Sequence, residues 1–328
     1  MRYKHFRNAN VDVSAMAVGT WPIGDCGYGT VTEKDSIEAI HAMFDNGVNM
    51  LDTAPDYGVG HSETVVGKAI KGYDRSKIFL ATKCCASALT LKSARTGRGY
   101  CRDGRYEDVL YECEQSLRRL GTDYIDFYFV HWPDVDTPFS ETMEAMKTLK
   151  QQGKIRFVGL SNFNKQQVLE CEKVVKVDVL QPPFSMVVRS SEDVMKWAVQ
   201  RGIDTCTYGS LGGGILTGAF RTAPDFERRD PRNFFYPFFR EPSFGKVMKV
   251  VDVLDQIAAE VGKPVSQVAV NWQTQQPHVS TALCGVRTAA EAVENCGAFE
   301  WELTDAQIQA INAAIAANLD FDGADRSR

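Results

Sequence analysis

The sequence predicts an α/β fold, specifically a (β/α)8 TIM barrel with a short N-terminal β-hairpin and long loops at the carboxyl ends of the strands. Eight short apolar runs alternate with amphipathic segments, and a polar or glycine-bearing turn follows each run, which is the pattern of parallel βαβ units. An open sheet rarely needs eight such units. A closed barrel needs that number and about 250 residues plus insertions, and the chain of 328 residues provides them.

The apolar runs predict strands at 15–18, 48–51, 77–82, 124–130, 155–160, 177–181, 203–208 and 280–285. Helices are expected near 33–46, 62–71, 106–120, 140–152, 164–174, 190–201, 246–262, 288–297 and 304–316. Helix boundaries carry local signals: Thr32 precedes two acidic residues at the first helix, and Gly47 follows its end. A hairpin is expected at 3–13, with long loops at 84–105 and 219–245. No linker or repeat divides the chain, so we expect a single domain over 1–328.

Composition narrows the functional classes. The hydrophobic fraction of 44% and the charged fraction of 24% are those of a globular protein. The net charge of −5 argues against nucleic-acid binding, because a polyanion requires a basic face. No apolar run is long enough to span a membrane, and the nine cysteines show no disulfide or zinc spacing. We therefore expect a cytoplasmic protein that does not bind nucleic acid. The sequence leaves the oligomeric state open.

Three residues at neighbouring strand ends suggest acid–base chemistry. Lys83 closes the strand "KIFLATK", and Asp52 ends the preceding strand, with Tyr57 five residues further on. A phenol has a pKa near 10, which is too high for efficient proton transfer at neutral pH, and a nearby ammonium stabilises the phenolate. Asp52 would hold Lys83 charged, whereas Asp56 is expected to shape the turn. Taken alone, Lys83 and Asp52 could equally form a structural salt bridge.

His131 ends the strand "YIDFYFVHW". It could be a core histidine bonded to the backbone, or it could donate a hydrogen bond to a substrate carbonyl oxygen. The other histidines (5, 41, 61 and 278) fall on expected loops, on helices or on the wrong face of the barrel, so we expect no metal site.

The strand ends in the second half of the chain carry neutral polar groups. Ser161, Asn162 and Gln181 could bind a carboxamide, and Tyr208 could offer its ring to a flat heterocycle. The run "GSLGGGILTG" (209–218) would let backbone N–H groups approach a pyrophosphate, although such a run is more often a flexible loop. Arg287 stands at a strand-to-helix turn, where an anion could bind.

These motifs, in this order, resemble the aldo-keto reductase family from about residue 3 to residue 317. The most specific blocks are "SLRRLGTDYIDFYFVHWPD" (116–134) and "GKIRFVGLSNF" (153–163), and the others are "GTW" (19–21), "LDTAPDYG" (51–58), "ATK" (81–83), "QPPFS" (181–185), "YGSLGGGILTG" (208–218) and "GVRTAAEAVEN" (285–295). The resemblance implies an NAD(P)(H)-dependent oxidoreductase that transfers hydride between nicotinamide C4 and an aldehyde, ketone, sugar or polyol substrate.

The resemblance also implies roles for individual residues. The catalytic tetrad would be Asp52, Tyr57, Lys83 and His131, with Tyr57 as the general acid or base. Substrate would contact Trp21, Tyr57, His131 and Trp132, together with Tyr28 and the two long loops. The cofactor-binding residues would be Gly19, Thr20, Trp21, Asp52, Ser161, Asn162, Gln181, Tyr208, Gly209, Ser210, Leu211, Gly212, Gly214, Gly285, Arg287, Glu291, Glu294 and Asn295.

The sequence favours NADP(H) as cofactor and leaves NAD(H) possible. Arg287 favours a 2′-phosphate, whereas a carboxylate at Glu291 would repel one and could bind ribose hydroxyls. Several residues depart from the family pattern: Phe184 and Ser185 replace a frequent tyrosine and asparagine, and Gly209-Ser210 replaces a frequent Ser-Pro.

Two other functions stay open. A nicotinamide-binding regulatory subunit would bind the same cofactor with little turnover. A metal-dependent or Schiff-base barrel enzyme, an aldolase or isomerase, could use Lys83, but Lys83 would then not be expected to pair with Asp52 and Tyr57. In the long loops, the basic residues of 84–105 could be solvated or could attract anionic substrates. The segment "NFFYPFFREP" (233–242) could cover the cofactor, meet a second subunit or form a lid.

Overall fold

The structure, a computed structural model, describes all residues except 25–28, 30, 322 and 324–328. Eight strands form a closed parallel barrel in the order β10-β11-β12-β3-β4-β5-β8-β9. Their bounds are β3 (Met16–Gly19), β4 (Met50–Asp52), β5 (Phe79–Cys84), β8 (Ile125–Val130), β9 (Ile155–Ser161), β10 (Val179–Gln181), β11 (Asp204–Thr207) and β12 (Thr281–Gly285). Each pair of neighbours is parallel, and β12 pairs with β3 to close the barrel. The predicted TIM barrel is confirmed.

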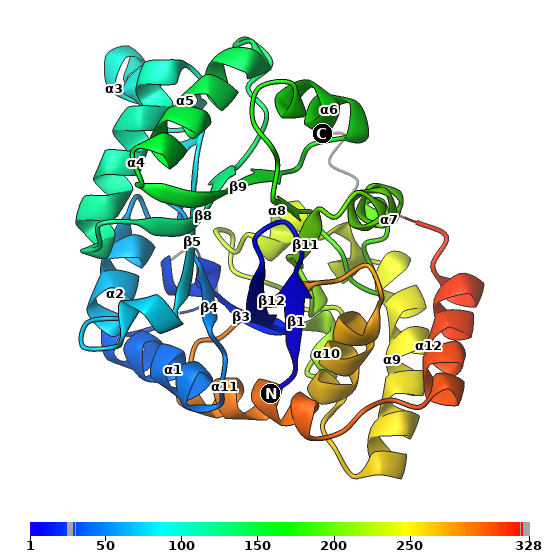
Figure 1. Cartoon of the computed structure of the whole chain (residues 1–328). Coiled ribbons are helices and arrows are strands. Elements are labelled where there is room, and N and C mark those ends of the chain that lie inside the picture. The colour runs from blue at the N-terminus through cyan, green and yellow to red at the C-terminus, as the bar shows by residue number, and fades with distance from the viewer. Residues whose placement is uncertain (25–28, 30, 322, 324–328) are drawn as a thin grey trace.

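Helices surround the barrel as an outer layer (Figure 1). They are α1 (Glu33–Asp45), α2 (His61–Ala69), α3 (Leu91–Thr96), α4 (Tyr106–Leu120), α5 (Phe139–Gln151), α6 (Lys165–Glu172), α7 (Glu192–Gln200), α8 (Arg232–Phe235), α9 (Ser243–Val261), α10 (Val265–Gln275), α11 (Ala289–Cys296) and α12 (Asp305–Asn318). The expected cap of α1 is present, because the Thr32 side chain accepts a hydrogen bond from the Asp35 N–H. Along the chain, α12 follows the last barrel unit and packs beside α9.

All eight expected barrel strands are present, with bounds shifted by a few residues. The sequence did not predict α10, and its burial explains why. Ser266 through Thr274 are all buried, so this helix has no polar face from which a helical period could be read. Its polar side chains are bonded inside the protein: Gln273 donates to the Phe184 carbonyl oxygen at 2.8 Å, and Asn271 donates to the Ala298 carbonyl oxygen at 2.8 Å.

The N-terminal hairpin closes one end of the barrel. Its strands β1 (Tyr3–Phe6) and β2 (Val11–Ser14) are antiparallel, as the sequence predicted, and they lie across the barrel in Figure 1. Phe6 and Val13 belong to the same buried cluster as the inward side chains of the barrel strands. The Phe6 and Phe127 ring centroids are 5.8 Å apart. Because the hairpin covers the end at which the strands begin, the opposite, carboxyl end is the one available for ligands.

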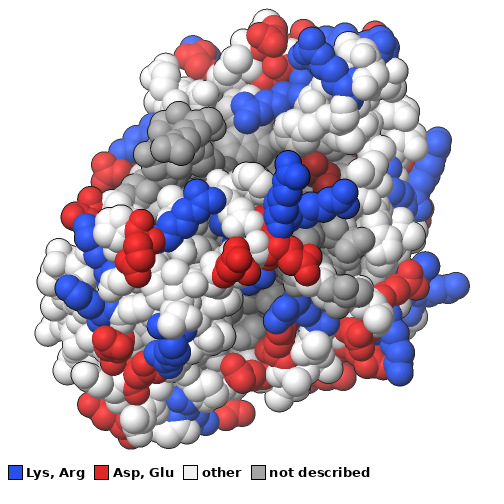
Figure 2. Space-filling view, turned by 180° about the vertical axis from the view of Figure 1, so that it is seen from behind, with Lys and Arg blue, Asp and Glu red and all other residues white. Residues whose placement is uncertain are grey.

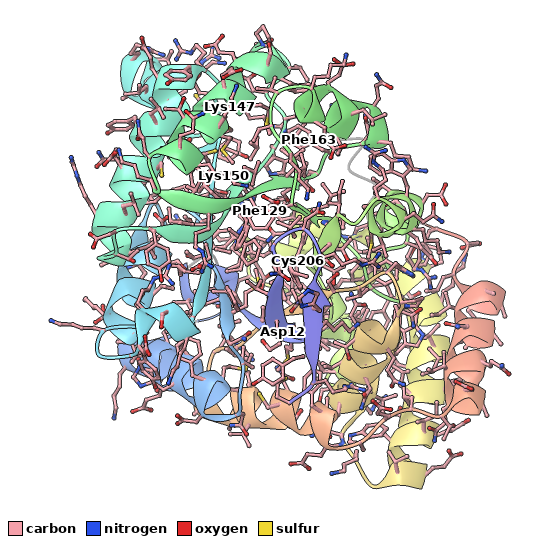
Figure 3. The ribbon with its side chains drawn as sticks, viewed as in Figure 1. Asp12, Phe129, Lys147, Lys150, Phe163 and Cys206 are labelled. Atoms are coloured by element: carbon pink, nitrogen blue, oxygen red, sulfur yellow. The ribbon has the colours of Figure 1, made fainter. Side chains whose placement is uncertain are left out.

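The barrel interior is filled by side chains. Phe129 and Cys206, labelled in Figure 3, are fully buried in this interior cluster. Lys147 and Lys150 in the same figure lie on α5, outside the barrel. A Cβ atom at Gly159 would approach the Phe129 ring to 2.3 Å, so only glycine leaves room for that ring. The cysteines follow the same pattern: the eight within the described residues are free and buried. No described helix is both long enough and apolar enough to cross a bilayer.

Candidate active site

A cavity of about 1700 Å³ opens at the carboxyl end of the barrel. Figure 2 shows the molecule from the side opposite to Figure 1, where Lys and Arg side chains are interspersed with Asp and Glu. Residues at the ends of β3, β4, β9, β10 and β12, and residues directly after β8 and β11, line the cavity. Its volume exceeds the roughly 300–1,000 Å³ typical of a single drug-sized ligand, so it can hold a large cofactor and a substrate together.

Lys83 is fully buried between two of the predicted site residues. Its Nζ donates to Asp52 Oδ2 at 2.7 Å and to the Thr53 carbonyl oxygen at 2.7 Å. The same Nζ lies 3.4 Å from the Tyr57 hydroxyl. The strand register makes these contacts possible, because Asp52 on β4 pairs with Ala81 on β5, two residues before Lys83. Lys83 itself does not line the cavity; Asp52 and Tyr57, which it contacts, do.

The turn after β4 presents Tyr57 to the cavity. The Tyr57 N–H donates to the Ala54 carbonyl oxygen at 3.2 Å, and the Ser62 N–H donates to the Tyr57 carbonyl oxygen at 3.1 Å. Gly58 has a φ of 64°, and a Cβ atom there would lie 2.1 Å from the Gly24 carbonyl oxygen. Glycine is therefore required next to Tyr57 by both conformation and space.

Burial dominates the electrostatics of the ion pair. It raises the pKa of Asp52 and lowers the pKa of Lys83, and the attraction between the two charges opposes both shifts. Glu63 and Asp56 also act on the Lys83 ammonium and raise its pKa. Three carboxylates thus favour the charged form of one lysine. This arrangement keeps a positive charge beside the Tyr57 hydroxyl.

His131 faces Tyr57 across the cavity wall. It directly follows β8, and its backbone N–H donates to the Cys84 carbonyl oxygen at 3.0 Å. The His131 and Tyr57 ring centroids are 6.2 Å apart, with the rings nearly perpendicular. The structure therefore brings together all four residues of the predicted tetrad.

The neutral polar residues form a hydrogen-bond chain that leads to Asp52. Tyr208 Oη donates to Asn162 Oδ1 at 2.8 Å, and Asn162 Nδ2 donates to Ser161 Oγ at 3.0 Å. Ser161 Oγ then donates to the Gln181 carbonyl oxygen at 2.8 Å, and Gln181 Nε2 donates to Asp52 Oδ1 at 2.8 Å. The predicted carboxamide-binding residues and the predicted tetrad are thus parts of one network.

The glycine run after β11 contributes to the cavity with one difference from the expectation. Gly209, Ser210, Leu211, Gly213 and Gly214 line it, as expected for the 209–214 stretch. Gly212 does not line the cavity, because its own Cβ position faces Ile215 and Val187. Gly213 and Gly214 have φ values of 65° and 100°, so the run is a defined turn. Ser210 Oγ is fixed by a hydrogen bond of 3.0 Å to the Leu283 carbonyl oxygen.

The far end of the cavity is lined by residues of the last barrel unit. Gly285, Arg287, Glu291, Glu294 and Asn295 all reach it. Arg287 Nη2 lies 2.6 Å from Glu291 Oε1, and the backbone N–H of Arg287 donates to Glu291 Oε2 at 2.8 Å. The two residues that were expected to act in opposite directions on the cofactor are therefore an ion pair.

Several further lining residues come from the helix α10 and from loop segments, where the sequence predicted no individual contacts. On the cofactor side these include Ser266 and the segment 232–237. Phe235 meets Trp21 edge to face, with ring centroids 5.6 Å apart, so the aromatic segment covers the cavity. On the substrate side they are Asp56, Tyr100 and Arg102. For the lining residues on the cofactor side, the aromatic composition of 233–242 was the one feature of the sequence that indicated them.

Of the remaining predicted contacts, some line the cavity and one is not described by the structure. Gly19, Thr20, Trp21 and Trp132 line the cavity as expected. Tyr28 lies outside the described residues. Within the described part of the chain, no group of three or more His, Cys, Asp or Glu side chains is placed to hold a metal ion.

The comparisons with known proteins show the family to which the chain belongs. The model of the aldo/keto reductase family matches residues 15–316. The chain belongs to this family. The aldo-keto reductase YhdN of Bacillus subtilis (strain 168) is 39% identical over 318 residues, which cover 96% of this chain and 94% of that protein.

Two further relatives carry more specific names. The NADH-specific methylglyoxal reductase of Escherichia coli (strain K12) is 30% identical, over 90% of this chain and 93% of that protein. The solved structure of the glycerol dehydrogenase AKR11B4 from Gluconobacter oxydans is 32% identical, with a TM-score of 0.87 over 97% of this chain and 96% of that one. This aldo/keto reductase is thus a member of an oxidoreductase family that acts on small carbonyl and alcohol compounds with NAD(P)(H).

The residues present fit a nicotinamide cofactor. Ser161, Asn162 and Gln181 supply amide and hydroxyl groups at one place in the cavity wall, and the Tyr208 ring lies beside them. The Gly213–Gly214 turn leaves backbone exposed to the cavity, and Arg287 supplies a cation at its far end.

Proposed function

We propose that this aldo/keto reductase interconverts an aldehyde, ketone or sugar with the corresponding alcohol or polyol, using NAD(P)(H), with Tyr57 as the general acid or base. The observation that carries this proposal is the placement of Lys83 Nζ, 2.7 Å from Asp52 Oδ2 and 3.4 Å from the Tyr57 hydroxyl. A phenol beside a buried ammonium can release a proton at neutral pH, because the ammonium stabilises the phenolate that remains.

The chain's own residues divide the work. In reduction, the Tyr57 hydroxyl gives its proton to the carbonyl oxygen as that oxygen gains negative charge. In oxidation, the Tyr57 phenolate takes the proton from the alcohol. His131, which faces Tyr57, orients the substrate oxygen by donating a hydrogen bond. Trp21 and Trp132 form aromatic walls that hold the rest of the substrate and exclude water.

The bound nicotinamide supplies the hydride to the carbonyl carbon in reduction, or accepts it in oxidation. Ser161, Asn162 and Gln181 would hold its carboxamide, and the network through these residues to Asp52 would fix the ring relative to Tyr57. Tyr208 would stack on the ring, and the Gly213–Gly214 turn would bind the pyrophosphate through backbone N–H groups.

We propose NADP(H) as the preferred cofactor, with NAD(H) as an alternative. Arg287 supports this preference because its guanidinium reaches the cavity and suits a 2′-phosphate. Its ion pair with Glu291 weakens the preference, because the carboxylate neutralises part of that charge. The balance between the two residues therefore sets how strongly one cofactor is preferred over the other.

The experiment is a turnover assay of the purified chain with a panel of aldehydes, ketones and sugars, in which the loss of NADPH or NADH absorbance is followed. The same panel run with NADP⁺ or NAD⁺ and with alcohols or polyols shows the working direction. Cofactor binding is measured separately by fluorescence titration. Turnover with any panel member supports the proposal. Tight cofactor binding without turnover in either direction would instead indicate a regulatory subunit that binds the cofactor without using it.

A further inference from the structure

Asp56 is a second carboxylate in the active-site cavity, next to the proposed proton donor. It immediately precedes Tyr57, and both side chains line the cavity. Asp52, by contrast, is fully bonded to Lys83 and Gln181. The two aspartates of this short segment therefore face different surroundings, and the mechanism uses only the first of them.

Asp56 does not hold the turn in which it lies. The hydrogen bonds of the turn are between backbone groups: the Tyr57 N–H donates to the Ala54 carbonyl oxygen, and the Gly60 N–H donates to the Pro55 carbonyl oxygen at 2.8 Å. An aspartate that shapes a turn accepts a hydrogen bond from a backbone N–H near it. No N–H group of the described residues donates to the Asp56 carboxylate, so the expectation that Asp56 shapes the turn finds no support in the structure.

The Asp56 carboxylate also lacks a side-chain partner among the described residues: no hydrogen bond or ion pair joins it to any of them. Burial raises its pKa to about 6, and the Lys83 ammonium opposes this shift. Asp56 is half-buried, and partial desolvation of a carboxylate that is not hydrogen-bonded is unfavourable for folding. Such a group in the wall of an active-site cavity is typical of a residue kept for its ligand.

The neighbours of Asp56 complete a wall suited to hydroxyl groups. Tyr100 and Arg102, from the loop between β5 and α4, line the same cavity. Asp56 and Arg102 both lie close enough to Tyr100 to act on it: burial raises the pKa of Tyr100 to about 12, Asp56 adds to this shift and Arg102 opposes it. The Arg102 guanidinium stands over the Trp132 ring, 5.0 Å from its centroid.

Two buried carboxylates of α4 fix the loop that carries this wall. Glu112 Oε2 accepts a hydrogen bond from the Cys85 N–H at 2.7 Å, and Asp108 accepts one from the Leu91 N–H. The short strands β6 (Ala86–Ser87) and β7 (Cys101–Arg102) then pair as an antiparallel hairpin. Arg102 is thus held in place by paired backbone.

We propose that Asp56 is a specificity-determining residue, which accepts hydrogen bonds from substrate hydroxyl groups on the carbons next to the reacting carbon, and so selects polyhydroxylated substrates over simple aldehydes. This inference rests on the proposed function. The two carboxylate oxygens can accept from two hydroxyls on adjacent carbons, while Tyr100 and Arg102 donate to the hydroxyl oxygens. The Trp132 face covers the C–H groups of such a substrate. An anionic substrate would instead be repelled by Asp56.

The test compares two aldehydes of equal carbon number, glyceraldehyde and propionaldehyde, with wild-type protein and with the Asp56→Ala and Asp56→Asn variants. The measured quantity is the ratio of kcat/KM for glyceraldehyde to kcat/KM for propionaldehyde. We expect Asp56→Ala to lower this ratio roughly 10- to 100-fold, as for the loss of hydrogen bonds to a charged group. Asp56→Asn keeps one acceptor oxygen, so its ratio should lie between that of Asp56→Ala and that of wild type. Asp136→Ala removes an exposed carboxylate outside the cavity and serves as the matched control.

Each outcome decides the matter. A fall in the ratio confined to the Asp56 variants supports the proposal, and the comparison of glycerol with 1-propanol in oxidation should show the same fall. A ratio within about twofold of wild type in Asp56→Ala would overturn it. An equal loss for both aldehydes would also overturn it, because Asp56 would then act on Tyr57 or Lys83 and not on the substrate. If wild-type protein turns over no member of the carbonyl panel with NADPH or NADH, the proposed function fails first, and this inference fails with it. If it turns over other members of the panel but not glyceraldehyde, only this inference is overturned. Should Asp56→Ala not fold, the isosteric Asp56→Asn variant decides.

Discussion

Replacing Asp52 by asparagine tests the buried ion pair. In wild type, Asp52 Oδ2 accepts from Lys83 and Oδ1 accepts from Gln181, with Lys83 fully buried. An amide offers one acceptor oxygen in place of two and carries no charge. The buried ammonium then keeps the Thr53 carbonyl oxygen, at 2.7 Å, as its nearest acceptor.

The size of the effect follows from the burial of both groups. Removing one partner of a buried ion pair destabilises a protein by about 3–5 kcal/mol. An unfolding entropy of about 2.1 cal/mol/K per residue gives about 0.7 kcal/mol/K for 328 residues. Asp52→Asn should therefore lower Tm by about 4–7 °C, as measured by calorimetry or circular dichroism.

The double variant Asp52→Asn/Lys83→Met separates the ion pair from other effects of the substitution. It removes the unpaired ammonium, and replacement of both charges is often neutral for stability. We expect the double variant to recover most of the Tm that Asp52→Asn loses. Its turnover should be abolished, because Tyr57 has lost its ammonium neighbour. An Asp52→Asn variant that melts within 1 °C of wild type would refute this reasoning. So would a double variant that is less stable than either single one.

Three further predictions concern the cavity wall. Glu291→Gln releases the Arg287 guanidinium from its carboxylate partner, so the ratio of kcat/KM for NADPH to that for NADH should rise several-fold; an unchanged ratio would contradict the role given to Glu291. The folded-state pKa of Asp56 is about 6, against 3.8 for the ordinary carboxyl, so its ionisation favours the unfolded state. In urea titrations, wild type should therefore lose stability relative to Asp56→Asn as the pH rises from about 4 to about 7, by at most roughly 3 kcal/mol. Above about pH 7 the difference between the two proteins should be constant. Phe235→Ala removes the edge contact with Trp21 and should weaken cofactor binding roughly 2- to 10-fold in a fluorescence titration; unchanged affinity would show that the segment does not cover the cofactor.

The sequence predicted the barrel and the residues at its strand ends for one physical reason. In a closed parallel barrel, every strand ends at the same face, so polar residues after apolar runs converge without knowledge of any loop. Asp52, Lys83 and His131 meet for that reason. Tyr57 depends only on the short turn after β4, and Gly58 signalled that turn.

Other features could not be predicted, because they depend on tertiary packing. The helix α10 is buried on every side, so its sequence lacks the amphipathic period on which helix prediction depends. The positions of Tyr100 and Arg102 are set by the hairpin of β6 and β7 and by hydrogen bonds to α4. The resemblance implied that the loop 84–105 would contact substrate, but nothing in its local sequence shows which of its side chains face the cavity.

One feature could have been predicted and was not. Arg287 and Glu291 are four residues apart at a helix start, and oppositely charged residues at this spacing commonly pair. Their ion pair has Nη2 and Oε1 only 2.6 Å apart. The carboxylate therefore acts on the arginine directly, and the pair as a unit influences cofactor preference.

The central claim is that Tyr57 carries the proton, and Tyr57→Phe tests it most directly. The variant removes one oxygen atom and keeps the ring that packs near Trp21 and His131. Tyr111→Phe, which changes an exposed tyrosine on α4, is the matched control. With cofactor affinity verified by fluorescence titration, we predict that Tyr57→Phe lowers kcat by roughly 10²- to 10⁴-fold and leaves cofactor binding unchanged, while Tyr111→Phe keeps wild-type turnover. Wild-type kcat in Tyr57→Phe would contradict the account.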